Sequence, residues 1–318
     1  MNRRQIVKDA IAHKETSRVP YCISFTPDGA ARLKELIGEC DVNDFVDNDI
    51  IQIYAPWWGW HELGPEWYQM DAPTTTATVS GCGSYPDFFD SLRALRDSTD
   101  KYILVMIYGS HFEKAYFSRG IENFLADMAG APDFARGLLN RIIEKNMVML
   151  ENFLCAREID GVLLGSDWGT QTGLIMAPST WEEMIRPGEQ REYDLIHSYD
   201  KDVWVHSCGN VEKVIPSLIE MGLDVLNPVQ PETMDLATLK KEYGDKLTFW
   251  GGISTQRALP FGSPEEVKQE TRRVRSLMSQ GGGYILAPAQ EIQGDVPAEN
   301  IMALIEVAKE MPHPESVT

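Results

Sequence analysis

The chain has too little positive charge for several classes of partner. Its 318 residues include 29 Lys and Arg against 48 Asp and Glu, which gives a formal net charge of −19. Proteins that bind nucleic acid or anionic membranes need a basic surface, and so does a site for a polyanion. The densest basic run, at residues 272–275, is flanked by Glu265, Glu266 and Glu270, as in a solvated helix face. The sequence therefore predicts neither a nucleic-acid partner nor a membrane partner.

Long apolar segments and paired cysteines are also absent. No stretch approaches the ~20 apolar residues of a membrane span. Residues 1–12 are patterned as an amphipathic helix, without the apolar segment of an export signal. The five cysteines, at positions 22, 40, 82, 155 and 208, lack the paired spacing of a disulfide scaffold. We therefore expect reduced thiols in a cytoplasmic protein, with Cys155 in the core on an apolar helix face.

Strand-like and helical patterns alternate along the chain. Short β-branched or aromatic runs separated by helical patterns are typical of a parallel sheet built from βα units. Eight such runs predict an α/β fold, a (β/α)8 TIM barrel, as one domain over residues 1–318. A long helix is predicted over 133–158, and capping boxes predict helix starts at Ser179 and Ser263. The predicted strands are residues 19–25, 50–54, 102–107, 161–164, 203–206, 225–226, 248–250 and 284–286.

In a barrel of this kind, the catalytic residues lie at the carboxyl ends of the strands. His206 and Cys208 follow a strand and stand two residues apart, so their side chains point to the same side. Imidazole and thiolate suit zinc, which makes the pair half of a zinc site; the alternative is a polar strand end without a metal. Asp167, at the end of the preceding strand, is either a third functional group or a loop cap.

Aromatic and polar side chains at the other strand ends are candidates for substrate contacts. For His111 among them, the simpler alternative is a hydrogen bond to the backbone alone. The predicted substrate-binding residues are Phe25, Tyr54, Trp57, Trp58, Tyr108, His111, Trp168, Gln171, Asn227, Gln230 and Gln290.

An aromatic-rich insertion at about residues 55–100 interrupts the βα pattern. Four of the eight tryptophans lie between positions 57 and 67. Their spacing does not fit one helix face. They pack a hairpin lid onto the barrel, line a pocket for a flat or apolar substrate, or do both, because aromatic side chains offer large contact areas.

Five segments of the chain carry a family pattern. They are HSCGNV (206–211), GLDVLNPVQ (222–230), WGGI (250–253), GGGYILAP (281–288) and DVPAEN (295–300). Together they resemble the uroporphyrinogen decarboxylase superfamily, most densely from residue 160 to 310. The resemblance implies a (β/α)8 barrel and one of two activities. These are decarboxylation in the haem pathway and zinc-dependent methyl transfer with a corrinoid carrier, as in coenzyme M methylases and O-demethylase systems.

The resemblance favours the methyltransferase branch. True decarboxylases of the family carry an Arg-rich segment after the first strand, whereas residues 25–32 here offer an acid and apolar side chains. In the methyltransferases, the residues that match His206 and Cys208 hold zinc together with a cysteine after the last strand. The matching segment, residues 287–291, has no cysteine. Glu291 and Asp167 are the candidates to complete a His/Cys/carboxylate site, and Gln290 is a candidate for a weak oxygen ligand.

These observations together predict a methyltransferase. It would move a methyl group between a small methoxy or methylated substrate, which the tryptophans suggest is aromatic, and a separate corrinoid-binding protein. Asp167, His206 and Cys208 are the predicted catalytic residues, and His206, Cys208 and Glu291 the predicted zinc ligands. The alternatives are a uroporphyrinogen decarboxylase-like lyase, acting on a tetrapyrrole or a small carboxylic acid, and a barrel without catalysis. The sequence leaves the oligomeric state open, a homodimer included.

Overall fold

The computed structural model describes residues 2–56, 85–107 and 109–310. The chain divides into two compact units. The first comprises Met1–Ile51, Asp100–Tyr102 and Asp224–Thr318, and the second comprises Gln52–Thr99 and Ile103–Leu223. The single domain over 1–318 stays a prediction. The lid at about 55–100 also stays a prediction, because most of that insertion lies outside the described residues. Its described end is the helix α4 (Tyr85–Ser98).

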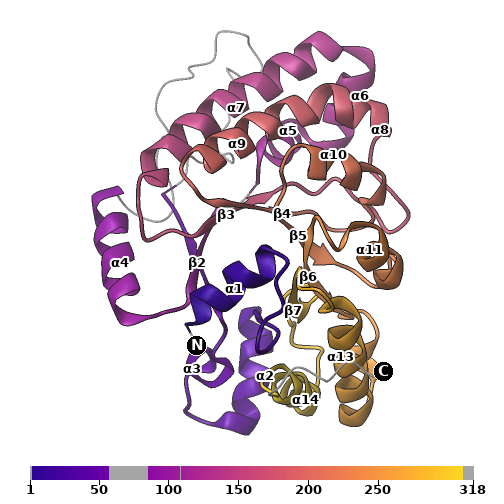
Figure 1. Cartoon of the computed structure of the whole chain (residues 1–318). Helices are drawn as coiled ribbons and strands as arrows, with labels where there is room; N and C mark the ends of the chain where they lie inside the picture. The colour runs from indigo at the N-terminus through magenta and orange to yellow at the C-terminus, as the bar shows by residue number, and fades with distance from the viewer. Residues whose placement is uncertain (1, 57–84, 108, 311–318) are drawn as a thin grey trace. The chain divides into compact units, whose positions relative to one another are not determined.

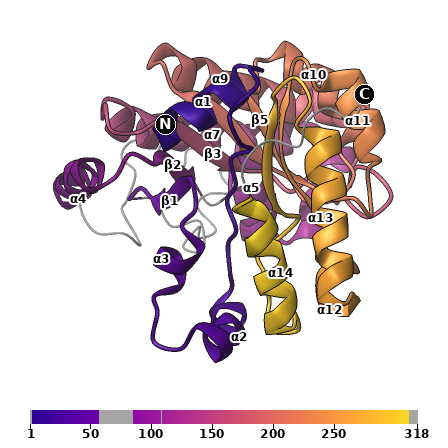
Figure 2. The ribbon, with the colours of Figure 1, turned by 60° about the horizontal axis from the view of Figure 1, so that its bottom comes forward.

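Three parallel strands form the centre of the first unit. β6 (Thr248–Ile253) lies between β5 (Val225–Val229) and β7 (Tyr284–Pro288). Every residue of these strands is buried, as expected for parallel strands that are covered on both faces. Two helices, α13 (Pro264–Met278) and α14 (Ala298–Ala308), lie side by side, and α13 contacts β6 (Figures 1 and 2).

Residues 19–25 do not form the regular strand that the sequence predicts. They make only isolated parallel bridges, such as the one between Tyr21 and Leu286 on β7. The side-chain amide of Asn48 accepts a hydrogen bond of 2.8 Å from the N–H of Ile23 and donates one of 2.9 Å to its carbonyl. The amide thus takes the two backbone groups that a neighbouring strand would pair. The segment follows β7 without joining a continuous ladder.

The second unit contains the strands that carry the candidate site. β3 (Gly161–Gly165) pairs in parallel with β4 (Asp202–His206) on one side and with residues 104–107 of β2 (Tyr102–Ile107) on the other. The long helix α7 (Pro132–Leu154) packs against α5 (His111–Arg119) and α9 (Arg186–Ser198), as Figure 1 shows. The remaining elements are α1 (Arg3–Ile11), α2 (Pro27–Ile37), α3 (Val42–Val46), β1 (Ile50–Tyr54), α6 (Ile121–Gly130), α8 (Pro178–Thr180), η3 (Trp181–Ile185), η4 (Glu212–Val214), α10 (Ile215–Glu220), α11 (Leu236–Tyr243) and α12 (Ala258–Phe261).

One of the two predicted capping boxes is present. Ser263 caps α13 and exchanges hydrogen bonds with Glu266, as predicted. At the other position, α8 begins without a side-chain cap, and the chain continues as the π-helical turn η3. There Glu182 instead accepts hydrogen bonds from Arg186 and Ser217. The predicted box at Ser179 was wrong because the helix begins at Pro178, with Ala177 at the N-cap, so Ser179 lies inside the helix.

Cys155 is exposed, against the expectation of a core position. α7 ends at Leu154, and Cys155 is its C-terminal cap. Two residues of a helix differ by about 200° around its axis. Cys155 therefore points away from the face on which Phe153 is fully buried.

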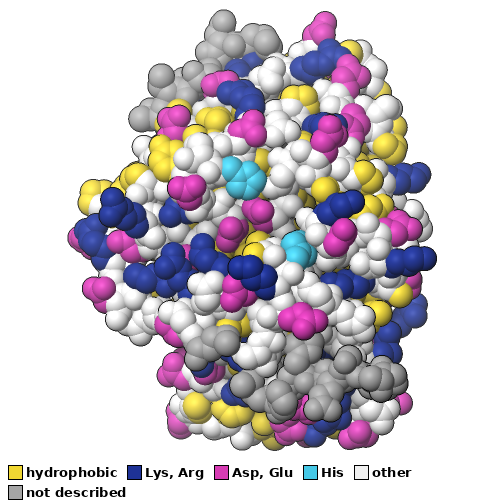
Figure 3. All heavy atoms as spheres, viewed as in Figure 1, with side chains coloured by type: hydrophobic (Ala, Val, Ile, Leu, Met, Phe, Trp, Pro, Cys, Tyr) yellow, Lys and Arg dark blue, Asp and Glu magenta, His cyan; other side chains and the backbone are white. Residues whose placement is uncertain are grey.

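Charged side chains of both signs are mixed on the surface. On the face shown in Figure 3, Lys and Arg lie among Asp and Glu. Exposed ion pairs such as Arg191–Glu144, at 2.7 Å, contribute to this mixture. Among the described helices, none combines the length and the apolar character that crossing a lipid bilayer requires.

Candidate functional site

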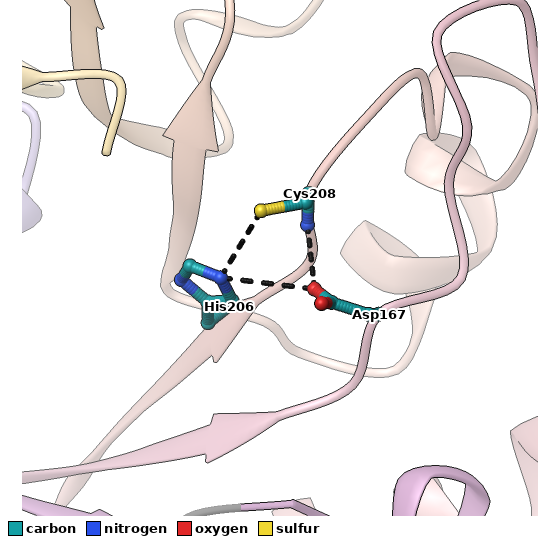
Figure 4. A group of neighbouring side chains, drawn as sticks. All are labelled: Asp167, His206 and Cys208. Atoms are coloured by element: carbon teal, nitrogen blue, oxygen red, sulfur yellow. Dashed lines mark hydrogen bonds and ion pairs between the residues drawn. The ribbon is translucent and has the colours of Figure 1, made fainter. Parts of the chain in front are cut away.

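Three side chains from the ends of two neighbouring strands meet in the second unit (Figure 4). His206 is the last residue of β4, Cys208 follows two positions later, and Asp167 lies two positions beyond the end of β3. Gly165 and His206 are register partners, so the chain leaves both strands at the same level. The backbone N–H of Cys208 donates a hydrogen bond of 2.9 Å to Oδ1 of Asp167. This bond holds the carboxylate beside the cysteine.

The donor atoms of this group have the spacing of metal ligands. Nε2 of His206 lies 3.4 Å from Sγ of Cys208 and 3.7 Å from Oδ1 of Asp167. All three donors lie within 4.8 Å of one another. Tetrahedral zinc, with bonds of roughly 2.0–2.3 Å, holds its ligands about 3.3–3.8 Å apart, and its usual donors are imidazole, thiolate and carboxylate. The residues present therefore fit a zinc ion.

The group is open to solvent. The side chain of His206 is 25% exposed and that of Asp167 is 38% exposed, and Cys208 is partly exposed as well. A small molecule can therefore reach all three. A catalytic zinc site needs such access, because it keeps one position for water or substrate.

Two glycines allow the loops that carry the group to touch. A Cβ on Gly169 would lie 2.3 Å from the carbonyl oxygen of Cys208, and a Cβ on Gly209 would lie 2.5 Å from the carbonyl carbon of Gly169. Gly209 also has a φ of 81°, which side chains other than glycine disfavour. The loop after β3 can therefore approach the loop after β4 only with glycine at both positions.

A buried carboxylate lies close to this group. Glu113, in the first turn of α5, is 6% exposed. Its Oε2 is 2.8 Å from the place that a Cβ on Gly165 would take. Burial and, next, the negative charge of Asp167 raise the pKa of Glu113 to about 7. Glu113 therefore changes its protonation near neutral pH, within the electric field of the candidate site.

A second group of one imidazole and two carboxylates is sealed in the interior. Nδ1 of His111, at the start of α5, lies 3.3 Å from Oε1 of Glu189 and 3.9 Å from Oε2 of Glu192, both on α9. The three side chains are at most 1% exposed. Burial, followed by the negative charge of Glu189, raises the pKa of Glu192. His111 also contacts the carbonyl of Ile185, at 3.1 Å from Nε2, so its partners include both backbone and carboxylates.

Three of these carboxylates were not among the predicted site residues. A glutamate in the first turn of a helix, as Glu113 is, is ordinary because it complements the helix dipole. Glu189 and Glu192 are three residues apart on one helix, a spacing that is equally common on exposed faces. The sequence offers no pattern that separates these buried acids from the many exposed ones.

The other predicted residues of the second unit occupy different environments. Trp168 is fully buried and packs edge-to-face on Trp181, with ring centroids 5.3 Å apart, whereas Gln171 is exposed. Tyr54 is 46% exposed and lines a hollow of about 210 Å³ between β1 and α4. The predicted contacts Trp57, Trp58 and Tyr108 lie outside the described residues. Substrate binding by all of these residues stays a prediction.

The remaining predicted residues belong to the first unit. Asn227 and Gln230 are buried at the end of β5, and the side-chain amide of Asn227 donates a 3.3 Å hydrogen bond to the carbonyl of Trp250. Gln290 and Phe25 are partly exposed and Glu291 is exposed. Their roles in substrate binding, and that of Glu291 in zinc binding, stay predictions.

Comparison with known proteins decides the family. The family model for uroporphyrinogen decarboxylase (URO-D) matches residues 69–311, which is more than half of the chain. The chain belongs to the URO-D family. The family resemblance of the five segments is thereby confirmed. No curated protein sequence matches this URO-D family member.

One solved structure confirms the α/β barrel class predicted for this URO-D family member. A methyltransferase from Methanosarcina mazei superposes with a TM-score of 0.71 at 15% identity, over 97% of this chain and 98% of that chain. At this identity the match shows the fold alone. A GH18 chitinase from Flavobacterium johnsoniae (TM-score 0.45, 10% identity, 92% of this chain and 94% of that chain) and a 3-keto-D-glucoside 4-epimerase from E. coli (0.43, 10%, 92% and 97%) are more remote.

Proposed function

We propose that this URO-D family protein is a methyltransferase that moves a methyl group between a small methylated substrate and a separate corrinoid-binding protein in the cytoplasm. The observation that carries this function is the convergence of His206, Cys208 and Asp167 at partly exposed strand ends. The histidine and cysteine match the zinc-binding pair of the methyltransferase branch. The fold similarity to a methyltransferase supports the same choice.

A zinc ion would be held by Nε2 of His206, Sγ of Cys208 and a carboxylate oxygen. Asp167 lies beside the other two donors. We therefore assign the third position to Asp167. When bound, zinc supplies Lewis-acid polarisation of the oxygen or sulfur atom that carries the methyl group.

The side chains of the site can also supply a proton. An ether oxygen that loses its methyl group gains negative charge, and a nearby acid stabilises it by donating a proton. In a metal-free site, His206 and Asp167 are the acids within reach, with Nε2 and Oδ1 3.7 Å apart. General-acid catalysis of this kind typically contributes about 10²- to 10⁴-fold to the rate.

The metal content of the purified protein tests the zinc assignment. We expect about one zinc per chain in this group, since the donor set fits a catalytic zinc site, and its loss in Cys208→Ala. Cys155→Ala is the matched control, because Cys155 is an exposed cysteine at the end of α7. Zinc that survives in Cys208→Ala would contradict the assignment.

Turnover tests the reaction itself. The protein is incubated with a reduced corrinoid-binding protein and, in turn, a methoxyarene, a methylamine and a methylthiol, and methylation of the corrinoid is followed by its absorption spectrum. We expect transfer from one class, most readily the methoxyarene, and a loss of about 10²-fold or more in Asp167→Asn. No transfer from any class, together with release of carbon dioxide from a tetrapyrrole carboxylate, would favour the decarboxylase instead.

A further inference from the structure

We propose that His111, Glu189 and Glu192 bind a second divalent metal ion, a buried structural ion separate from the site at His206. Their three donor atoms lie within 4.8 Å of one another in the interior of the second unit. The side chains are at most 1% exposed, so no substrate reaches them from solvent. The role of such an ion would be to tie α5 to α9.

The orientation of the imidazole points to a cation between these side chains. Nε2 of His111 lies 3.1 Å from the carbonyl of Ile185, which can only accept, so Nε2 carries a proton. The other nitrogen, Nδ1, faces both carboxylates and lies 3.2 Å from Oγ of Ser110. A lone pair on Nδ1 and the oxygens of Glu189 and Glu192 repel one another unless a proton or a metal ion lies between them. Metal-binding histidines typically donate their second N–H to a carbonyl in this way.

Hydrogen bonds from neighbouring side chains orient the two carboxylates. Glu192 accepts hydrogen bonds from Ser110 Oγ (2.6 Å) and Asn146 Nδ2 (2.8 Å). Oε1 of Glu189 accepts one from Ser166 Oγ (3.2 Å). Carboxylates that bind metals are usually oriented by hydrogen bonds of this kind from the surrounding side chains.

A tyrosine on the same helix reaches this group. Tyr193, four residues after Glu189 on α9, is fully buried, and its side chain interacts with that of Glu189. The oxygen of Glu189 that faces His111 is Oε1. The proposed ion would therefore be bound through Oε1 of Glu189.

The donor set selects the class of ion. One imidazole with two carboxylates suits a divalent first-row ion such as manganese, iron or zinc, rather than a soft ion that prefers thiolates. Bonds of roughly 2.0–2.2 Å in tetrahedral geometry separate the donors by about 3.3–3.6 Å. The observed 3.3 Å fits, and the observed 3.9 Å requires Glu192 to close in by a few tenths of an ångström. Because the group is sealed, the ion would enter as the chain folds.

Anomalous X-ray diffraction from crystals of the unmodified full chain tests the proposal directly. The protein is produced in medium that contains manganese, iron and zinc, and data are collected on both sides of each absorption edge. We expect an anomalous peak between His111, Glu189 and Glu192, whether or not a peak also occurs at His206. A peak at His206 alone, a water molecule at the buried position, or no peak at all would overturn the buried site.

Variants separate the two metal positions in solution. The protein is unfolded, stripped of metal with a chelator and refolded with manganese, and bound metal is then counted. We expect Glu189→Gln to lose about one equivalent per chain and Glu183→Gln, an exposed glutamate in η3, to lose none. Cys208→Ala should keep this equivalent. Equal manganese content in Glu189→Gln and Glu183→Gln would overturn the buried site, and the crystals decide the question if Glu189→Gln fails to refold.

Discussion

The second unit holds two groups of imidazole and carboxylate that differ in their access to water. At the ends of β3 and β4, the side chains of His206 and Asp167 are 25% and 38% exposed. Around His111, the corresponding side chains are at most 1% exposed. Neighbouring residues of the chain contact the two groups. Ser166 donates a hydrogen bond to Glu189 of the buried group, and the next residue, Asp167, faces His206 in the exposed group. The same residue types are therefore available to a substrate in one group and unavailable in the other.

This difference in exposure predicts a difference in function. A charged side chain in contact with solvent changes the free energy of unfolding little. We therefore expect a substitution in the exposed group to have little effect on folding. A buried charge is tolerated only with its partners. We therefore expect changes in the exposed group to affect activity, and changes in the buried group to affect stability.

The largest loss of stability is expected for Glu192→Ala. The substitution removes a buried carboxylate that faces His111 and accepts hydrogen bonds from Ser110 and Asn146. Breaking a buried ion pair typically costs about 3–5 kcal/mol. Urea unfolding measures the change, and Glu144→Ala on the exposed side of α7 is the control. Similar losses in both variants would remove the contrast between buried and exposed groups.

Glu113→Gln is expected to change how stability depends on pH. The pKa of Glu113 rises from 4.5 to about 7 in the folded protein, so between these values the folded protein holds a proton that the unfolded chain has released. Stability from this group therefore falls as the pH rises through that window, by an amount on the order of 3 kcal/mol.

As the pH rises from 4.5 to 8, we expect the free energy of unfolding to fall less in Glu113→Gln than in the unmodified protein. Urea unfolding at several pH values measures this slope. Glu122→Gln, an exposed position on α6, should leave the slope as it is. A slope that is the same in Glu113→Gln and in the unmodified protein would show that the carboxyl group of Glu113 has an ordinary pKa.

Gly169→Ala is expected to destabilise the protein by about 1–3 kcal/mol, as overpacking typically does. The new methyl group would lie 2.3 Å from the carbonyl oxygen of Cys208, so the loop has to move, and the spacing of Asp167 and Cys208 with it. Thermal unfolding and metal content report the two effects. Gly130→Ala is the control, because a Cβ there meets nothing within 4 Å. An unaltered metal content in Gly169→Ala would show that the loops tolerate separation.

The smallest effect is expected for Cys208→Ser in protein treated with a chelator. Cys208 is partly exposed, and a surface contact of this kind is typically worth less than about 1 kcal/mol. In protein that has not been treated with a chelator, activity should nevertheless be lost, because the thiolate is a proposed zinc ligand. Cys40→Ser, at an exposed cysteine, is the control for both measurements. A loss of several kcal/mol in Cys208→Ser would place this side chain among the structural residues instead.

Much of the fold could be predicted from the sequence because its signals are local. The apolar runs at residues 161–164, 203–206 and 284–286 are strands, and the capping box at Ser263 begins a helix. The prediction failed where a distant residue intervened. The side chain of Asn48 makes the hydrogen bonds with Ile23 that a neighbouring strand would make. No sequence pattern near residues 19–25 indicates this contact.

The sequence by itself predicted that His206 and Cys208 lie together at a strand end, because side chains two residues apart on a strand point the same way. In the structure the strand ends at His206, and the loop that follows brings Cys208 to 3.4 Å from it. The place of Asp167 beside them followed from the parallel order of two adjacent strands. Only the tertiary structure decided that His111 meets Glu189 and Glu192, which lie far away in the chain. Helix periodicity predicts which residues share a face of a helix. Their burial depends on how α5 and α9 pack together, and contacts between segments distant in sequence determine this packing.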